Sequence, residues 1–285
     1  MGELERVQPG TLSDTEETSL GASTVGVSPL DPLGCVDNQT VEGAGIQGGV
    51  DRRDPVCGSG DRSGDDLTEK KQVMYPGIIE VPDEIREKLV NFAASSRYED
   101  YQSLRLLFYL TAFLQPQTVV EFGTYIGCSA AHLAAGMARE DAKVVSVDKY
   151  VYADIDKVEK SLTDYGFMAQ IKLACADTFT CREMLTEECP DEISMLFMDA
   201  AHEYVGLSIE FEQVRYLLAN SNVVIVDDLN LLGINQWVNE ISQQYPYTIK
   251  VPFHKGVAIM FNDPDFWTPI SKAIQQAKVP EWRSL

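Results

Sequence analysis

The stretch TVVEFGTYIGCSAAHLA, residues 118–134, indicates the fold class of this chain. A β-branched run ends at Phe122, and Gly123 and Gly127 lead into a segment of small residues that is expected to begin a helix near Ser129, with that residue as its N-cap. A strand, a glycine turn and a helix N-terminus in this order suit an anionic group such as a carboxylate. The spacing is not the Gly-x-Gly-x-x-Gly pattern of dinucleotide-binding turns. Taken alone, the stretch also fits an ordinary strand-to-helix connection.

Short β-branched runs alternate with helical segments through most of the chain. The helical segments include 129–140, 152–166 and 205–221, and the β-branched runs are TVVEF, KVVSV, IKLAC, ISMLFM and NVVIV. Two further helices are predicted over 82–98 and 99–114, of which the second is the more apolar. This alternation predicts an α/β fold, in which helices cover both faces of a mainly parallel sheet. Ligands of such sheets bind at the carboxyl ends of the strands.

The first 74 residues differ in composition from the rest. They contain no Phe, Trp, Tyr or His, hold 12 of the 20 glycines, and show neither helical nor strand periodicity. A segment with so little apolar surface cannot offset the entropy lost on ordering. We therefore predict a disordered, acidic, Gly-rich tail over 1–74 and one folded domain over 75–285.

The whole chain is acidic, with a formal charge of −21. Nucleic acid and anionic membranes are therefore poor partners, and no apolar run approaches the ~20 residues of a membrane-spanning helix. The start MGELER has no signal-peptide apolar region, so a cytoplasmic location is expected. The six cysteines show no CxxC pair and are predicted to be free thiols in a reducing compartment. Assembly into a homo-oligomer is left open.

Acidic residues follow the second and third β-branched runs. Asp148 lies at the end of KVVSVD, where an acid can accept both hydroxyls of a ribose. Asp177 follows IKLACA beside the same crevice and suits an adenine amino group. A carboxylate-binding turn and a ribose-binding acid together describe a nucleoside that carries an amino-acid tail.

These two motifs, VVEFGTYIGCSA and VVSVDKY, resemble those of class I S-adenosylmethionine-dependent methyltransferases, in the branch of the catechol and caffeoyl-coenzyme A O-methyltransferases. The resemblance covers about 100–262. It implies a Rossmann-like, doubly wound, mostly parallel seven-stranded sheet and S-adenosyl-L-methionine as methyl donor. Its methionine part would contact the glycine turn and its adenine the Ala176–Asp177 stretch, while Glu121 would support the turn from behind. The implied cofactor-binding residues are Glu121, Gly123, Thr124, Tyr125, Gly127, Ser129, Asp148, Ala176, Asp177 and Asp199.

Three carboxylates follow the fourth and fifth runs. Asp199 ends ISMLFMD, and Asp227 and Asp228 end NVVIVDD, so all three are expected at one edge of the sheet. Such a cluster repels itself unless it is protonated or neutralised by a cation, and Mg²⁺ is the cation that prefers oxygen ligands of this kind. We predict a metal site formed by Asp199, Asp227 and Asp228. The alternative is that Asp199 caps the following helix and the Asp pair begins a polar loop.

His202 lies three residues beyond Asp199, within reach of a substrate hydroxyl above that site. An imidazole with a pKa near 6.5 suits the removal of a proton at neutral pH. The pattern Asp-x-x-His followed by Asp-Asp resembles that of the macrolide-sugar O-methyltransferases, which implies His202 as catalytic base. Many members of that family have Asp-Gly-Asp-His, and Ala200 and Ala201 replace the middle pair here. His132 and His254 are expected to be ordinary packed or surface residues.

The resemblance implies an enzyme that methylates a hydroxyl of a small molecule, such as a sugar or another natural-product diol. Helices within 75–115 are expected to lie over the acceptor site, and Tyr98, Tyr101, Asn230 and Trp237 are candidate acceptor contacts by position. Two alternatives stay open. One is a metal-independent methyltransferase, and the other is a non-catalytic S-adenosylmethionine-binding protein that serves a partner enzyme.

Overall fold

A computed structural model describes residues 79–96 and 100–278 of the chain. All of them belong to one compact unit, Thr68–Leu285. The predicted tail over 1–74 lies outside the described residues, and its boundary stays a prediction. Within the described part, no helix is both long and apolar enough to cross a bilayer.

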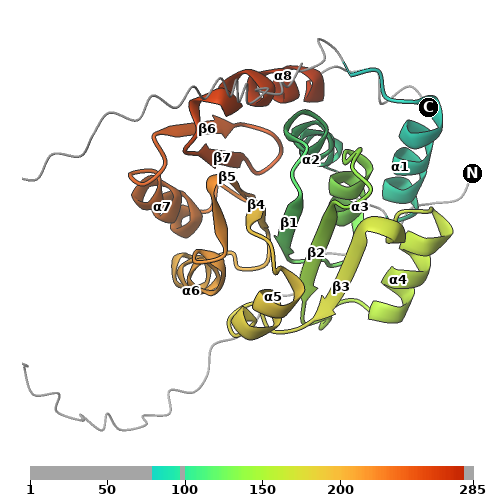
Figure 1. The fold of residues 1–285 in the computed structure, drawn as a ribbon, viewed down its shortest axis with the longest axis horizontal. Helices are drawn as coiled ribbons and strands as arrows, with labels where there is room; N and C mark the ends of the chain where they lie inside the picture. Colours follow the sequence, from blue (N-terminus) through green and yellow to red (C-terminus); the bar gives the residue numbers. More distant parts are fainter. Residues whose placement is uncertain (1–78, 97–99, 279–285) are drawn as a thin grey trace, which may run out of the picture. The chain divides into compact units, whose positions relative to one another are not determined.

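The described chain forms a single seven-stranded sheet in the order β3-β2-β1-β4-β5-β7-β6 (Figure 1). Strands β1 to β5 pair in parallel, whereas β7 runs antiparallel to both of its neighbours. The predicted doubly wound, mostly parallel α/β sheet is thereby confirmed. The strands are β1 Thr118–Phe122, β2 Lys143–Asp148, β3 Ile171–Cys175, β4 Ile193–Met198, β5 Leu218–Val226, β6 Tyr247–Val251 and β7 Val257–Phe261.

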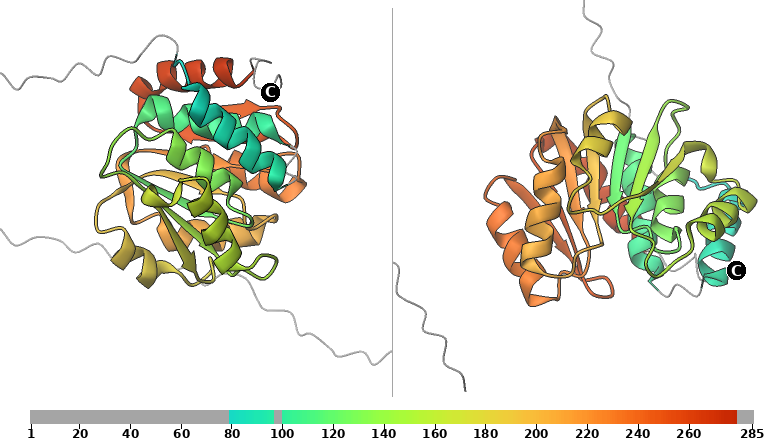
Figure 2. Two further views of the ribbon diagram at one scale, coloured as in Figure 1. Left: turned by 90° about the vertical axis from the view of Figure 1, so that its right-hand side faces the viewer. Right: turned by 90° about the horizontal axis from the view of Figure 1, so that it is seen from below.

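Helices cover both faces of this sheet (Figures 1 and 2). Alternate residues of each central strand enter two separate hydrophobic clusters, one with α1, α2, α3, α4 and α8 and the other with α5, α6 and α7. The strands are therefore apolar on both sides, as parallel strands covered by helices are. The helices are α1 Asp83–Ser95, α2 Tyr101–Leu114, α3 Cys128–Ala135, α4 Ile155–Asp164, α5 Arg182–Glu188, α6 Tyr204–Val214, α7 Leu232–Ile241 and α8 Trp267–Ala277.

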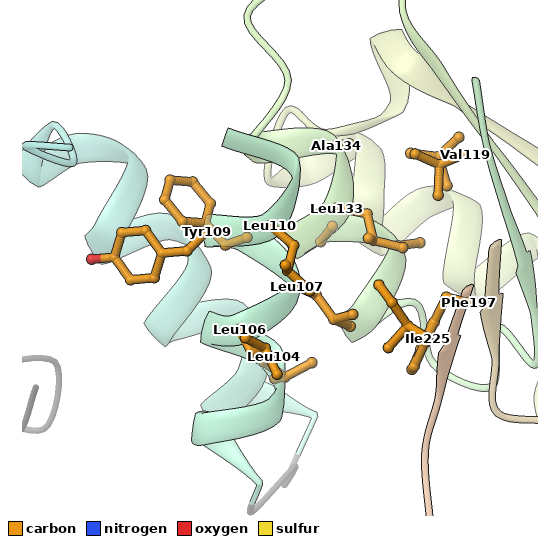
Figure 3. Packing of buried hydrophobic residues seen from close by; sticks show 14 of the residues in the cluster. Leu104, Leu106, Leu107, Tyr109, Leu110, Val119, Leu133, Ala134, Phe197 and Ile225 are labelled. Carbon is orange, nitrogen blue, oxygen red and sulfur yellow. The ribbon is translucent and has the colours of Figure 1, made fainter. Parts of the chain in front are cut away.

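Helix α2 is the centre of the first cluster (Figure 3). Leu107 and Leu110 of α2 lie beside Leu133 of α3, and this layer packs onto the sheet at Phe197 and Ile225. On its outer side α2 packs against α8, where the guanidinium of Arg105 donates to the carbonyl of Gln276 at 2.8 Å. Helix α2 thus belongs to the core and contacts α3, α8 and the sheet.

Two local predictions are wrong. The helix predicted over 205–221 ends at Val214, because Leu218 to Ser221 join β5, where Leu218 pairs with Ile193 of β4. Pairing with a neighbouring strand overrides the local helical pattern there. Helix α3 begins at Cys128 with Gly127 as N-cap in a left-handed conformation, so Ser129 lies inside the helix and does not cap it.

Candidate active site

A cavity of about 610 Å³ opens at the carboxyl ends of the strands, where β1 neighbours β2 on one side and β4 on the other. The strand order reverses at this point, which is where open α/β sheets bind ligands. Gly123 lines it at the end of β1, with Asp148 on the β2 side and Asp199 and Asp228 on the β4 and β5 side. The cavity therefore joins the two groups of residues that the sequence singles out.

The glycine turn after β1 is held against the end of β4. Gly123 donates its N–H to the carbonyl of Val147, and the N–H of Asp199 donates to the carbonyl of Phe122, both at 2.9 Å. Gly123 has a φ of +96°, and a Cβ at this position would lie 2.4 Å from the carbonyl oxygen of Asp199. Both the dihedral angle and the contact require glycine here.

A buried acid supports the turn from behind. Glu121 is fully buried at the end of β1 and does not line the cavity; its Oε2 accepts a hydrogen bond from Ser146, while its Oε1 has no partner among the described residues. Burial raises the pKa of Glu121 to about 7, although the hydroxyls of Ser129 and Ser146 act to lower it. Ser146 also bonds Thr124 of the turn at 2.6 Å, so the acid is connected to the cavity wall.

Asp148 lines the cavity at the end of β2. Its carboxylate accepts backbone N–H groups of Tyr125 at 2.9 Å and Tyr150 at 2.7 Å. Each carboxylate oxygen can accept more than one hydrogen bond, so Asp148 is oriented by the backbone and can still bind a ligand. Thr124, Tyr125 and Ser129 line the same wall, whereas Gly127 does not.

The residues predicted for adenine do not line the cavity. Asp177 forms an ion pair with Lys149 at 2.9 Å, and neither it nor Ala176 reaches the cavity wall. Thr178 and Phe179 line that region, together with Glu210 of α6.

Glu210 lines the cavity, although the sequence analysis does not predict it as a site residue. It is fully buried, and its Oε1 accepts the hydroxyl of Thr178 at 2.7 Å. Burial raises the pKa of Glu210 to about 7. The signal was present in the sequence, because Glu210 falls in the apolar stripe formed by Leu207, Phe211 and Val214.

Three carboxylates converge on the opposite wall of the cavity. Asp199 follows β4, and Asp227 and Asp228 follow β5, with the N–H of Asp227 donating to the carbonyl of Met198 at 3.1 Å. Burial, with repulsion from the other acids, raises the pKa of Asp199 well above its ordinary value. Burial likewise raises the pKa of Asp227 to about 6. The structure thus brings together the three acids predicted from separate strand ends.

His202 and Lys255 pair with Asp228. The Nδ1 of His202 lies 3.2 Å from Oδ2 of Asp228, and the ammonium of Lys255 lies 3.1 Å from Oδ1 and 3.2 Å from Oδ2. Burial acts to raise the pKa of Asp228, but hydrogen bonds from His202 and Lys255 outweigh it and lower that pKa. The same bond to Asp228 raises the pKa of His202. No sequence pattern predicts that Lys255 lies at this site, because its position depends on the antiparallel direction of β7.

This wall has donors that fit a divalent cation. Donor atoms of Asp199, His202 and Asp228 all lie within 4.8 Å of one another, and Asp227 lines the cavity beside them. Carboxylate oxygens are the ligands that Mg²⁺ prefers. Burial and repulsion between the acids raise the pKa values of Asp199 and Asp227, so a cation bound beside them would favour their charged forms. This set differs from the predicted one, since His202 replaces Asp227 among the converging donors.

Most of the residues predicted from position to contact the acceptor do not line the cavity. Trp237 is 2% exposed and packs edge-on against Phe211 in the core, and Tyr101 packs against the other hydrophobic cluster, so neither lines the cavity. Asn230 also lies outside the cavity wall, and Tyr98 lies outside the described residues. The cavity is lined instead by Asp100 at the start of α2, by Tyr125, Val151 and Tyr152, and by His254, which was expected to be an ordinary residue.

A comparison with known families agrees with this geometry. Residues 120–229 match a family model described as a methyltransferase domain. Over this range the chain is similar to a methyltransferase domain. The matched range begins in β1 and ends just after Asp228, so it includes the glycine turn, Asp148, the β4 end and the paired acids.

Curated and solved proteins resemble parts of this chain. The rhamnosyl O-methyltransferase of Mycobacterium tuberculosis is 30% identical over 131 residues, which are 42% of this chain and 49% of that protein. The chain thus spans about half the length of the curated relatives that it matches.

Two solved structures share the fold. A methyltransferase from Geobacter sulfurreducens is 23% identical, with 65% of this chain and 92% of that chain covered and a TM-score of 0.50. An O-methyltransferase from Bacillus cereus, solved in complex with SAH, is 16% identical, with 66% and 93% covered and a TM-score of 0.51. At these identities the likeness concerns the fold alone.

Proposed function

We propose that this protein transfers the methyl group of S-adenosylmethionine to a hydroxyl of a small molecule that carries a vicinal diol, such as a sugar. The observation that carries the proposal is the single cavity in which the glycine turn and Asp148 face the pair formed by His202 and Asp228. The similarity to a rhamnosyl O-methyltransferase supports a sugar hydroxyl as acceptor. A cytoplasmic location and a role in natural-product biosynthesis stay predictions.

The wall formed by β1 and β2 would hold the methyl donor. Backbone N–H groups at the start of α3, with the Ser129 hydroxyl, suit the donor's carboxylate, and Asp148 suits the ribose hydroxyls. Glu121 keeps the turn in place through Ser146 and Thr124. Thr178 and Phe179, in place of Ala176 and Asp177, would contact the adenine ring.

The wall formed by β4 and β5 would hold the acceptor. With the proton of the neutral imidazole on Nδ1 and shared with Asp228, Nε2 of His202 is free to accept a proton. Nε2 takes the hydroxyl proton while the acceptor oxygen forms a bond to the methyl carbon and the carbon–sulfur bond breaks. The products are the methyl ether, S-adenosylhomocysteine and a protonated His202. Asp228 stabilises that imidazolium, which requires the aspartate to be charged.

Asp199 and Asp228, whose carboxylate oxygens lie close together, would hold Mg²⁺, with Asp227 and His202 beside them. An ion bound there would lower the pKa of the acceptor hydroxyl and help to orient it. Asp199 lies against the glycine turn, so the acids that hold the ion are fixed relative to the donor wall. Correct relative placement of donor and acceptor is itself a large part of catalysis.

Formation of S-adenosylhomocysteine from a panel of diol-bearing sugars and phenols tests the reaction. For His202→Ala we expect the turnover number to fall by about 10²- to 10⁴-fold, the usual contribution of a general base. Donor binding, measured by calorimetry, should be unchanged. A His202→Ala variant with full turnover at every pH would exclude His202 as the general base.

The same assay in EDTA tests whether the reaction requires a divalent cation. Activity that is lost in chelator and restored by Mg²⁺ is expected, and undiminished activity in chelator would favour the metal-independent alternative. One observation favours that alternative, because Lys255 already pairs with Asp228. Donor binding without product from any acceptor would indicate the non-catalytic alternative.

A further inference from the structure

The loop between β6 and β7, residues 252–256, reaches the candidate metal ligands because β7 is reversed. Strand β6 ends, and β7 begins, at the edge where β1 to β5 have their carboxyl ends. The loop is bonded to the residues that follow Asp228: the N–H of Leu229 donates to the carbonyl of Gly256 at 2.9 Å, and the N–H of Asn230 to that of Lys255 at 2.8 Å. Lys255 is therefore placed by a backbone hydrogen bond at its own carbonyl and a second one at the next residue.

The backbone of this loop is specialised. His254 has a φ of +41° and Gly256 a φ of +89°, both in the left-handed region. A Cβ on Gly256 would approach the Cβ of Leu229 to 3.1 Å, so the loop packs tightly on the β5 end. A non-glycine residue in this region is uncommon and needs support from the surrounding structure. The loop thus has a defined shape that presents Lys255 to the cavity.

The ammonium of Lys255 is bonded to both oxygens of Asp228, at 3.1 and 3.2 Å. The side chain of Asp228 is only 5% exposed, whereas that of Lys255 is 55% exposed. The lysine can therefore leave toward solvent, but the aspartate cannot. Both oxygens of Asp228 already accept from Lys255, and Oδ2 also lies 3.2 Å from His202, so a divalent ion bound at Asp199 and Asp228 would lie beside the ammonium and repel it.

We propose that Lys255 is a resident counter-ion that competes with a divalent cation for Asp228 and so weakens the affinity of this site for the ion. The proposal rests on the proposed function, since it concerns the same metal site. In the metal-free protein Lys255 stabilises the buried aspartate and keeps it oriented toward His202. On binding of the ion, the lysine swings out and exposes its amine.

Titration of the full-length protein with Mg²⁺ by calorimetry tests this competition. Removing a hydrogen bond to a charged group at Lys255→Met should tighten Mg²⁺ binding by about 10- to 100-fold. Lys255→Arg, which retains the positive charge, should bind nearly as weakly as the native protein. Lys250→Met is the matched control, because Lys250 lies in β6 of the same hairpin but donates to Asn239 at 2.7 Å and changes the net charge equally.

A second measurement uses the native protein and does not depend on the folding of a variant. Acetylation of Lys255 by an amine-reactive reagent, followed by mass spectrometry, should become faster at saturating Mg²⁺, while that of Lys250 stays constant. Equal Mg²⁺ affinities of Lys255→Met and Lys250→Met, or unchanged acetylation, would overturn the proposal that Lys255 competes with the ion. The proposed metal site would not be contradicted by that result. Absence of Mg²⁺ binding in the native protein and in every variant would overturn both the competition and the metal site. Methyl transfer is judged separately, by formation of S-adenosylhomocysteine.

Discussion

Replacing Gly123 by alanine tests the contact between the glycine turn and the end of β4. The new Cβ would lie 2.4 Å from the carbonyl oxygen and 2.7 Å from the carbonyl carbon of Asp199, at a φ of +96°. Left-handed backbone costs a non-glycine residue about 1–2 kcal/mol. Separating the two backbones adds about 1–3 kcal/mol, the usual range for overpacking. We therefore expect the free energy of unfolding of Gly123→Ala to fall by about 2–5 kcal/mol.

Gly166→Ala separates the two contributions. Gly166 has a similar φ of +81°, but a Cβ there would meet nothing within 4 Å, so only the dihedral cost of about 1–2 kcal/mol should appear. Urea unfolding gives both values, and calorimetry gives the affinity for S-adenosylhomocysteine, which should fall in Gly123→Ala alone. Losses of stability that agree within about 0.5 kcal/mol, together with equal ligand affinities, would refute the contact.

Three further predictions concern a buried acid, the donor site and the core. Burial raises the pKa of Glu121 from its ordinary value of 4.5 to about 7, so between these pH values the folded state holds a proton that the unfolded chain has lost. As pH rises from 4.5 through 7, the free energy of unfolding should therefore fall by about 3 kcal/mol because of this group. Urea unfolding of Glu121→Gln should not show that fall, and an identical pH dependence in the variant would contradict the raised pKa. Asp148→Ala should weaken S-adenosylhomocysteine binding by about 10- to 100-fold in calorimetry, and an unaltered affinity would remove Asp148 from the site. Trp237→Ala should lower the free energy of unfolding by about 3–5 kcal/mol, whereas loss of acceptor binding at normal stability would restore Trp237 to the acceptor pocket.

The sheet and the position of the cavity could be predicted because their signals are local. Each β-branched run is short and bounded by polar or glycine residues, and parallel strands bring their carboxyl ends to one edge. Gly123, Asp148 and Asp199 were therefore placed near one another from sequence alone. Their roles in binding and catalysis stay predictions that the experiments above test.

Other features depend on contacts between distant segments. Lys255 reaches Asp228 only because β7 is antiparallel, and no local pattern encodes that direction. Asp177 satisfies the spacing expected of an adenine contact, yet it pairs with Lys149 and does not line the cavity. Trp237 follows Asp228 closely along the chain, which suggests an acceptor contact, but its helical stripe with Ile234 and Val238 indicates a core position.

The strand order also has a consequence for protein synthesis. Strand β7 lies between β5 and β6, so β6 has no place in the sheet until the ribosome has delivered β7. Asp199, Asp227 and Asp228 are made earlier, and their ammonium partner arrives on the hairpin that closes the sheet. A nascent chain that stops before Lys255 therefore carries the acids without their ammonium partner.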